Sequence, residues 1–294
     1  MNIAVGLPAF NEEKNIASII AKLEKISNTI IVCDDGSSDL TSTIASKMGA
    51  IVISHKKNMG YGAAIRSLFL KAQELDVDAL VTFDADGQHD VNDIKKVIEP
   101  ISNNTADLVI GSRFLDQAKN DIPSYRKTGI KIITKITNTS LKEKIKDSQS
   151  GFRAYNKELI AKIIPSDHGM GVSSEILIKA SKNDFRITEV PIKISYDGNT
   201  STHHPISHGV SVTLSTLKFI SIDHPLKFYG IPGTIFLIVG LFFTIWTLQL
   251  FSETREIVTN ISLLAIGTII FGTMLMMTSI ILYSVVNLIR EKNT

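Results

Sequence analysis

The sequence contains a single cysteine, Cys33, and no strong excess of charge of either sign. One cysteine excludes an intrachain disulfide and is compatible with a reducing compartment. The formal net charge of +2 at pH 7 argues against nucleic acid as a main partner, because proteins that read a phosphate backbone concentrate far more positive charge. No G-x-G-x-x-G follows the first strand-like run, which disfavours a dinucleotide-binding enzyme.

Charge is also absent from two long segments near the C-terminus, Tyr229–Phe251 and Ile257–Leu288. Each is at least as long as the ~20 apolar residues that a helix needs to cross a bilayer. We predict a transmembrane hairpin with helices at 229–251 and 257–289. A pair of buried core helices is the alternative, but core helices seldom run this long without a polar face. A signal peptide is not expected, because the chain starts with a strand-like segment.

Basic residues lie at the outer ends of both predicted spans. Lys218 and Lys227 precede the first, and Arg290 and Lys292 follow the second. The positive-inside rule then places both ends of the hairpin in the cytoplasm. We predict a multi-pass protein of the cell membrane, or of the endoplasmic reticulum membrane in a eukaryote, with a cytoplasmic N-terminal domain. Residues 206–226 form a predicted amphipathic juxtamembrane segment in the membrane interface, with a helix packed on the domain as the alternative.

Residues 1–205 alternate strand-like and helix-like segments, the rhythm of a parallel sheet. In chain order these predicted elements are Ile3–Leu7, Ile16–Ile26, Ile30–Cys33, Ile51–Ser54, Tyr61–Glu74, Ala79–Phe83, Val91–Ile101 and Leu108–Gly111. We predict an α/β domain whose mostly parallel sheet is covered on both faces. Ligands collect beyond the carboxyl ends of such strands. The polar clusters that follow four strands are therefore expected to form one crevice: Pro8–Glu13, Asp34–Asp39, Asp84–His89 and Ser112–Arg113.

Asp84 and Asp86 form a D-x-D pattern at the end of an apolar strand. Together with Gln88 they present hard oxygen ligands of the kind that Mg²⁺ or Mn²⁺ binds. A divalent ion there would bridge the diphosphate of a nucleotide sugar and neutralise the leaving group. The pattern alone is weak evidence, because Asp is common in turns and helix caps. Asp90 and Asp93 are predicted to be caps of that sort.

Several longer motifs occur in one order along the chain. They are Leu7-Pro8-Ala9-Phe10-Asn11-Glu12-Glu13, Asp34-Asp35-Gly36-Ser37-Ser38-Asp39, Asn58-Met59-Gly60-Tyr61-Gly62-Ala63-Ala64, Asp84-Ala85-Asp86-Gly87-Gln88-His89, Gly111-Ser112-Arg113-Phe114 and Asp147-Ser148-Gln149-Ser150-Gly151-Phe152-Arg153. In these motifs the chain resembles family 2 glycosyltransferases of the dolichyl-phosphate mannosyltransferase type, over roughly residues 3 to 196. The resemblance implies a GT-A-type nucleotide-sugar transferase domain.

The resemblance also implies roles for individual residues. Those that would hold the nucleotide sugar are Pro8, Phe10 in place of the more usual Tyr, Glu12, Asp35, Asp84 and Glu175. The metal, Mg²⁺ or Mn²⁺, would be held by Asp84, Asp86 and Gln88. The catalytic residues would be Asp86, Arg113 and Arg126, and the residues toward the acceptor phosphate would be Arg113, Arg126 and Arg153. His203 is predicted to join them, although it lies in a stretch that departs from the family pattern. A solvent-facing helix carboxylate is the alternative for Glu175, and a simple strand turn is the alternative for Gly151–Arg153.

One stretch departs from the family pattern. Where many relatives have an Arg followed by Gly-x-Ser-Lys, this chain has Tyr196–His204, so the family's basic residue is missing. His203, His204 or His208 would take over its phosphate contact, and exposed loop histidines without that role are the alternative. Zinc binding is disfavoured because no fourth ligand is apparent.

Lys127, Lys131 and Lys135 recur at every fourth position and share one helical stripe. Such a stripe is usually a solvated face. The sharper interpretation is contact with anionic lipid headgroups, worth ~1 kcal/mol per charge.

We predict that the protein moves a hexose from a GDP- or UDP-linked sugar to dolichyl or undecaprenyl phosphate, in one displacement that inverts the anomeric centre. A phosphate acceptor is already anionic, so positioning and charge neutralisation would supply most of the catalysis. One alternative is a transferase that acts on a hydroxyl of a glycolipid or polysaccharide. Another is a non-catalytic membrane partner that binds nucleotide sugars, which the intact Asp84, Asp86, Gln88 and Arg113 disfavour. A homo-oligomer is compatible with the sequence.

Overall fold

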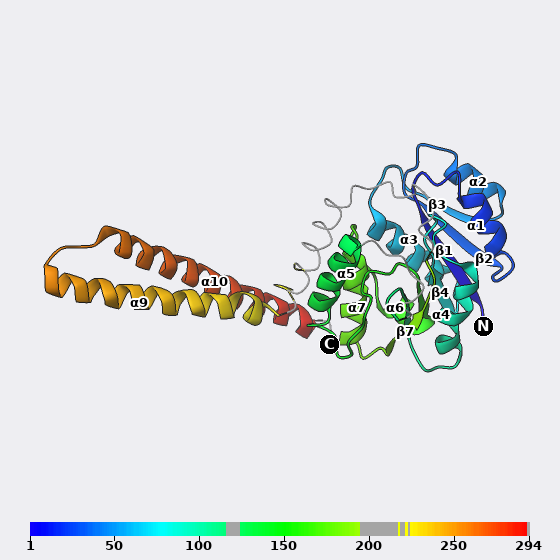
Figure 1. Cartoon of the computed structure of the whole chain (residues 1–294). Helices are drawn as coiled ribbons and strands as arrows, with labels where there is room; N and C mark the ends of the chain where they lie inside the picture. Colours follow the sequence, from blue (N-terminus) through cyan, green and yellow to red (C-terminus); the bar gives the residue numbers. More distant parts are fainter. Residues whose placement is uncertain (116–123, 195–216, 218–220, 223, 293–294) are drawn as a thin grey trace. The chain divides into compact units, whose positions relative to one another are not determined.

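The computed structural model describes residues 1–115, 124–194, 217, 221–222 and 224–292 (Figure 1). The chain forms two compact units, Met1–Thr216 and Leu217–Thr294. Most of the predicted juxtamembrane segment 206–226 lies outside the described residues, as do His203, His204 and His208, so the predictions made for them stay predictions.

The first unit is built on one sheet of seven strands in the order β3-β2-β1-β4-β6-β5-β7. The strands are β1 Ile3–Ala9, β2 Thr29–Asp34, β3 Ile51–Ser54, β4 Ala79–Thr82, β5 Leu108–Ser112, β6 Arg153–Asn156 and β7 Ile187–Pro191. Neighbouring strands are parallel, except that β6 runs antiparallel to both β4 and β5. The prediction of a mostly parallel α/β sheet is confirmed, and β6 and β7 are strands that it did not include.

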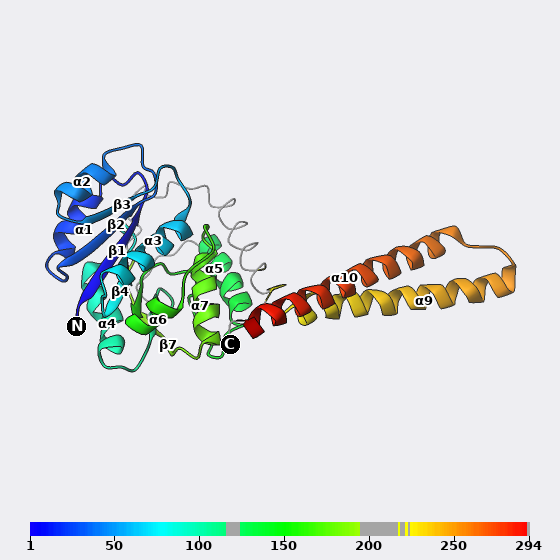
Figure 2. The same cartoon turned by 180° about the vertical axis from the view of Figure 1, so that it is seen from behind.

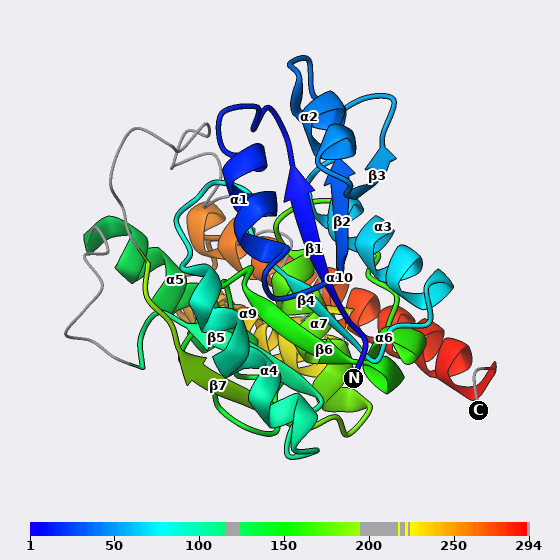
Figure 3. The ribbon, with the colours of Figure 1, turned by 90° about the vertical axis from the view of Figure 1, so that its right-hand side faces the viewer.

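Helices cover both faces of this sheet (Figure 3). The helices on one face are α1 Ile16–Leu23, α2 Thr41–Lys47 and α4 Ile94–Ser102, and those on the other are α3 Tyr61–Glu74, α6 Lys157–Lys162 and α7 Val172–Lys182. Successive side chains of a strand point to opposite faces. Thus Val5 and Leu7 of β1 pack with the first set, while Ala4 packs with the second. A further helix, α5 Ser124–Thr137, approaches α7 where Thr137 Oγ1 lies 3.1 Å from Ser174 Oγ.

The predicted helix Val91–Ile101 starts with a 3-10 turn, Val91–Asp93, before α4. Asp90 caps this turn, since its side chain accepts a hydrogen bond from Asn92 N. Asp93 was predicted to be a cap as well, and it occupies the N-cap position of α4, but its side chain makes no capping hydrogen bond. Its buried carboxylate instead accepts from Lys193 N at 2.8 Å, far along the chain.

The second unit contains a π-helical turn, Leu226–Gly230, followed by α9 Ile231–Thr254 and α10 Thr259–Lys292. Figures 1 and 2 show the two long helices side by side. Glycines allow this close packing: a Cβ on Gly240 would lie 2.6 Å from Ile269 Cγ1. Leu226–Thr254 and Thr259–Val286 each reach a mean hydropathy of 2.1. They are long and apolar enough to cross a membrane, in the same region as the predicted spans.

Candidate active site

The loops that follow β1 and β2 are tied to each other by main-chain and side-chain hydrogen bonds. Asp35 N donates to Ala9 O at 2.9 Å. Asn11 N donates to Ser37 Oγ, and Asn11 Oδ1 accepts from Ser38 N, both at 2.9 Å. Asn11 has φ of +56°, a conformation that Asn tolerates better than most residues. The carboxyl ends of these parallel strands thus form one rigid edge.

Asp35 is buried at this edge, with 4% of its surface exposed. Its carboxylate accepts from Met59 N at 2.9 Å and Gly60 N at 2.8 Å, and it lies 2.6 Å from His55 Nδ1. His55 Nε2 lies in turn 2.9 Å from Ser67 Oγ. Three of about four lone-pair positions of the carboxylate are therefore taken. Asp35 holds the loop before α3 in place, and its contact with a nucleotide stays a prediction.

Glu12, Asp84 and Asp86 lie close enough to change one another's ionisation. Burial raises the pKa of Glu12, with a smaller contribution from the charges of Asp86 and Asp84. Burial and the charge of Asp84 raise the pKa of Asp86. Like charges gathered in a partly buried site cost free energy unless a cation neutralises them. The three carboxylates therefore favour binding of a cation.

Asp84 is held in place by two neighbouring side chains. Tyr61 Oη donates to Asp84 Oδ1 at 3.1 Å, and His89 Nε2 lies 3.5 Å from Asp84 Oδ2. Burial alone would raise the pKa of Asp84, but its interactions with His89, Tyr61 and Arg113 outweigh burial and lower it. The His89 ring packs against both Phe83 and Phe152, with ring centroids 5.7 and 5.3 Å away. Asp84 is therefore held ionised and in a fixed orientation.

The donor set fits a divalent ion that arrives with a diphosphate. Within the described ranges, no group of three His, Cys, Asp or Glu side chains is arranged to hold a metal by itself. Mg²⁺ needs no such group, because it usually keeps several waters and takes only one or two carboxylates plus substrate phosphates. Gln88 N donates to Asp86 Oδ1 at 3.0 Å and orients that carboxylate. Asp84, Asp86 and Gln88 are thus suitable ligands.

Gly151 lies directly against Asp84. A Cβ on Gly151 would lie 2.5 Å from Tyr61 Oη and 2.7 Å from Asp84 Oδ2. We expect Gly151→Ala to displace the carboxylate and lower the turnover number roughly 100-fold, because a shift of about 1 Å can cost that much. Steady-state rates across a range of Mn²⁺ concentrations would measure the loss. Gly129→Ala is the matched control, since its Cβ would meet nothing within 4 Å; equal activity of the two variants would contradict the prediction.

Arg113 follows β5 and is oriented by Asp147. Its Nε and Nη2 each donate to the Asp147 carboxylate at 2.7 Å, and Arg113 N donates at 3.1 Å. Asp147 is fully buried. Burial would raise its pKa, but the charge and hydrogen bonds of Arg113 lower it. A bidentate pair fixes the plane of the guanidinium, and the same charge lowers the pKa of Asp84. Arg113 therefore lies close to the carboxylate site.

Arg153 was predicted to face the acceptor phosphate, and its geometry does not permit this. Only 1% of its surface is exposed. The guanidinium donates to the main-chain oxygens of Ser148, Ser150 and Ser173, each at 2.8 Å. We therefore reassign Arg153 to a positioning role, in which it holds the loop before β6 against the start of α7.

Glu175 needs a similar correction, because it is fully buried rather than facing solvent or a nucleotide. Its carboxylate accepts from Ser166 N and Asp167 N at 2.8 Å and lies 2.6 Å from Lys179 Nζ. Burial would raise the pKa of Glu175, but the hydrogen bonds from Lys179, Ser166 and Asp167 lower it. Glu175 thus fixes the loop before α7, which touches the start of α3 through a bond from Gly62 N to His168 O.

The other predicted site residues are placed with less detail. Pro8 is buried and Phe10 half-buried at the carboxyl end of β1, so their nucleotide contacts stay predictions. The Arg126 side chain and His203 lie outside the described residues. The predicted site did not include Tyr61, His89, Asp147, Gly151 and His55. All except His55 lie within the motifs that carry the resemblance. Tyr61, Gly151 and Asp147 have partners that are distant in the chain, whereas His89 contacts Asp84 of its own motif.

Paired carboxylates at the edge of such a sheet, beside an oriented arginine, are typical of nucleotide-sugar transferases. The model of glycosyl transferase family 2 matches residues 4–164, and the chain belongs to this family. The protein is therefore a glycosyltransferase by family.

Two similar proteins come from archaea. A UDP-N-acetylglucosamine–dolichyl-phosphate N-acetylglucosaminyltransferase of Methanococcus voltae is 35% identical over 230 residues, covering 71% of this chain and 89% of the relative. A dolichyl-phosphate hexose transferase of Haloferax volcanii is 30% identical over 219 residues, covering 74% and 93%.

The fold is similar to that of glucosyl-3-phosphoglycerate synthase from Mycobacterium tuberculosis, solved in complex with UDP. The TM-score is 0.59 at 22% identity, and the match covers 74% of this chain and 79% of that one. This likeness supports the GT-A-type fold and nothing more specific.

Proposed function

We propose that this protein transfers a hexose from a GDP- or UDP-linked sugar to a polyprenyl phosphate, dolichyl or undecaprenyl, at the cytoplasmic face of a membrane. The observation that carries the proposal is the gathering of Glu12, Asp84 and Asp86 beside the Arg113–Asp147 pair. Two relatives whose names specify dolichyl phosphate support the acceptor. The two candidate spans support work at a membrane, with the domain on the side that the flanking lysines and arginines predict.

Mg²⁺ or Mn²⁺ is the proposed cofactor, and structures of the fold neighbour were solved with each ion. When bound, a divalent ion neutralises the charge that develops on the leaving diphosphate. Asp84 and Asp86 would hold it together with the Gln88 side chain. Tyr61 and His89 keep Asp84 oriented before the donor arrives, so little reorganisation is needed at the moment of reaction.

Arg113 would attract the acceptor phosphate and align it with the anomeric carbon of the sugar. Its orientation is set in advance by Asp147, so binding loses little side-chain freedom. A phosphate monoester is already anionic near neutral pH, and the attack needs no strong general base. Attack from the side opposite the diphosphate inverts the anomeric centre in one step. Arg126 and Glu12 remain proposed contacts of the phosphate and the nucleotide.

The proposal is tested by incubating membranes that contain the full-length protein with radiolabelled nucleotide sugars, a polyprenyl phosphate and Mn²⁺. We expect label from one donor to enter the organic-solvent extract, and none without metal. NMR of the product should show an anomeric configuration opposite to that of the donor.

The readout separates the rival activities. Release of nucleoside diphosphate without labelled lipid would overturn the phosphate acceptor and point to a hydroxyl acceptor. Absence of both products with every donor, in a protein that binds nucleotide sugars, would point to a non-catalytic partner. A retained anomeric configuration would rule out the single displacement.

A further inference from the structure

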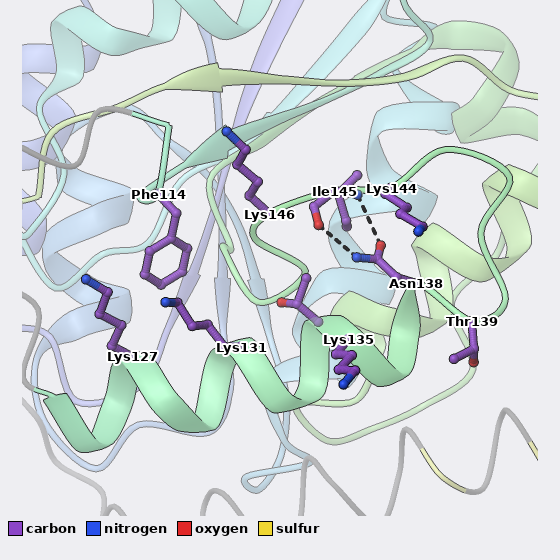
Figure 4. Close-up of a pocket in the computed structure, with 10 residues that line it drawn as sticks. Phe114, Lys127, Lys131, Lys135, Asn138, Thr139, Lys144, Ile145 and Lys146 are labelled. Carbon is purple, nitrogen blue, oxygen red and sulfur yellow. Dashed lines mark hydrogen bonds between the residues drawn. The ribbon is translucent and has the colours of Figure 1, made fainter.

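A cavity of about 550 Å³ lies beside α5 in the first unit (Figure 4). Five lysines line it, three from α5 and two from the segment before β6: Lys127, Lys131, Lys135, Lys144 and Lys146. Figure 4 shows Lys127 and Lys131 projecting from α5 toward the side where Phe114 lies. The helical stripe seen in the sequence is therefore one wall of a concave site and not only a solvated face.

The two groups of lysines are fixed relative to each other by a pair of hydrogen bonds. Asn138 Nδ2 donates to Ile145 O at 2.9 Å, and Ile145 N donates to Asn138 Oδ1 at 3.1 Å (Figure 4). Ile145 is itself buried, whereas Lys144 and Lys146 on either side of it are exposed. This reciprocal clamp holds the segment with Lys144 and Lys146 against the end of α5. The two walls of the cavity are thus held together by hydrogen bonds within the fold.

The charge of this cavity is unbalanced. Among the residues that the structure describes, no acidic side chain lines it. Among the described residues, no carboxylate lies in ion-pair contact with any of its five lysines, whereas the adjacent Lys142 pairs with Asp184. Five like charges around one concavity raise the local positive potential and attract polyanions. A ligand that brings several negative oxygens would remove this repulsion.

We propose that this lysine cavity binds a phosphoryl group, carried by a ligand about the size of a lipid headgroup. A volume of about 550 Å³ lies in the range of small-molecule sites, and ammonium groups bind phosphate well. Two other lining residues, Phe114 and Ile145, offer apolar contact to the rest of the ligand. The inference rests on the proposed function only because it expects membrane lipid near the domain. The cavity is a site separate from Glu12, Asp84 and Asp86.

The cavity lies next to the arginine pair. Phe114 directly follows Arg113, whose guanidinium carbon lies 5.9 Å from the Phe114 ring centroid. Lys146 directly precedes Asp147, and the main-chain N–H groups of both residues donate to Glu189. A ligand in the cavity would thus contact Phe114 and Lys146, the sequence neighbours of Arg113 and Asp147. Its binding would stabilise the position of the Arg113–Asp147 pair.

The site is tested by amine footprinting of the full-length protein in phosphatidylcholine nanodiscs, with no sugar donor or acceptor present. Acetylation rates of the cavity lysines are compared with those of Lys22, Lys47 and Lys95, exposed lysines on other helices. One arm adds phosphatidylglycerol to the discs, and the other adds soluble pyrophosphate with a chelator. We expect at least one arm to slow acetylation of the cavity lysines several-fold relative to the three reference lysines.

Protection by phosphatidylglycerol alone identifies a lipid headgroup, and protection by pyrophosphate alone identifies a soluble phosphorylated ligand. Equal protection of cavity and reference lysines in both arms, or no protection in either, overturns the proposal. Because no transfer is measured, the outcome does not depend on the proposed activity. A failed transfer assay with intact protection would refute the function and leave this site standing.

A substitution series provides the second measurement. In Lys127→Gln/Lys131→Gln/Lys146→Gln, the ligand concentration that half-protects Lys135 and Lys144 should rise about 100-fold, at about fivefold per lysine. The control variant Lys22→Gln/Lys47→Gln/Lys95→Gln makes the same change in net charge and should leave that concentration unchanged. If the half-protecting concentration rose equally in the two variants, the effect would come from the net charge of the protein. That result would overturn the assignment of the binding site to the cavity.

Discussion

Asp86→Asn should lower the rate of sugar transfer at least about 100-fold while leaving the protein no less stable. The substitution keeps the size of the side chain and removes one charge from the proposed metal site, and removing one such electrostatic contribution typically costs 10²–10³ in rate. Burial and the charge of Asp84 raise the pKa of Asp86, so the folded protein disfavours the ionised form. Stability and activity are therefore expected to change in opposite directions.

The measurement combines transfer rates with thermal unfolding of the full-length protein in detergent. Mn²⁺ with a nucleoside diphosphate should raise the melting temperature of the wild type, and it should do so less in Asp86→Asn. Asp90→Asn is the matched control: it removes the same charge four residues away, and Asn caps a helix as well as Asp does. Normal transfer by Asp86→Asn would show that this carboxylate does not serve catalysis.

Asp147→Asn should destabilise the protein by about 3 kcal/mol and also impair transfer. Asp147 is fully buried and binds Arg113 through two side-chain bonds of 2.7 Å. Removing one partner of a buried pair leaves the other charge uncompensated, which typically costs about 3–5 kcal/mol. The melting temperature should fall by roughly 6–12 °C. Arg113 loses its fixed orientation at the same time, so the affinity for the acceptor phosphate should fall.

The pH dependence gives this prediction a second readout. The pKa of Asp147 is lowered in the folded protein, so its stabilising contribution is present above the ordinary carboxyl range. That contribution is lost as the pH falls through the folded-state pKa. The stability difference between wild type and Asp147→Asn should therefore shrink in acid and be constant near neutral pH.

Asp76→Asn is the control for Asp147→Asn. It breaks an exposed pair with Lys157, in which the two side chains are 77% and 53% exposed. Asn accepts the left-handed conformation of this position, where φ is +50°. An exposed pair is worth only about 0–1 kcal/mol, so the melting temperature should hardly move. An equally small effect of Asp147→Asn would mean that the buried pair does not orient Arg113.

The local sequence pattern was sufficient to predict those helices and strands whose apolar residues recur with a simple period. The bounds of β3 and α3, Ile51–Ser54 and Tyr61–Glu74, agree with the prediction to the residue, since apolar periodicity and neighbouring glycines mark them. The strand β6, Arg153–Asn156, has only four residues and was not predicted. Its place between β4 and β5 depends on pairing with two distant segments, which no local period encodes.

Some residues of the candidate site could be predicted from the sequence, and others could not. A D-x-D at the end of an apolar strand identified Asp84 and Asp86 without the fold, because strand ends and acidic residues are both visible in the chain. Residue type did not reveal where Arg153 and Glu175 point. Both were expected to contact ligands, and both are buried against main-chain groups. A charged side chain that binds such partners in the folded core is not available to contact a ligand. The sequence pattern does not show those partners, because they come from elsewhere in the chain.

By itself, the sequence determined the α/β class, the two apolar helices, the acidic motif and the stripe formed by Lys127, Lys131 and Lys135. These follow from the spacing of neighbouring residues, which periodicity makes readable. Only the tertiary structure decided that Asp147 orients Arg113, that Gly151 touches Asp84, and that Lys144 and Lys146 complete the lysine cavity. Each of these depends on contacts between segments far apart in the chain, and such contacts form only when the sheet order and the packing of helices bring those segments together.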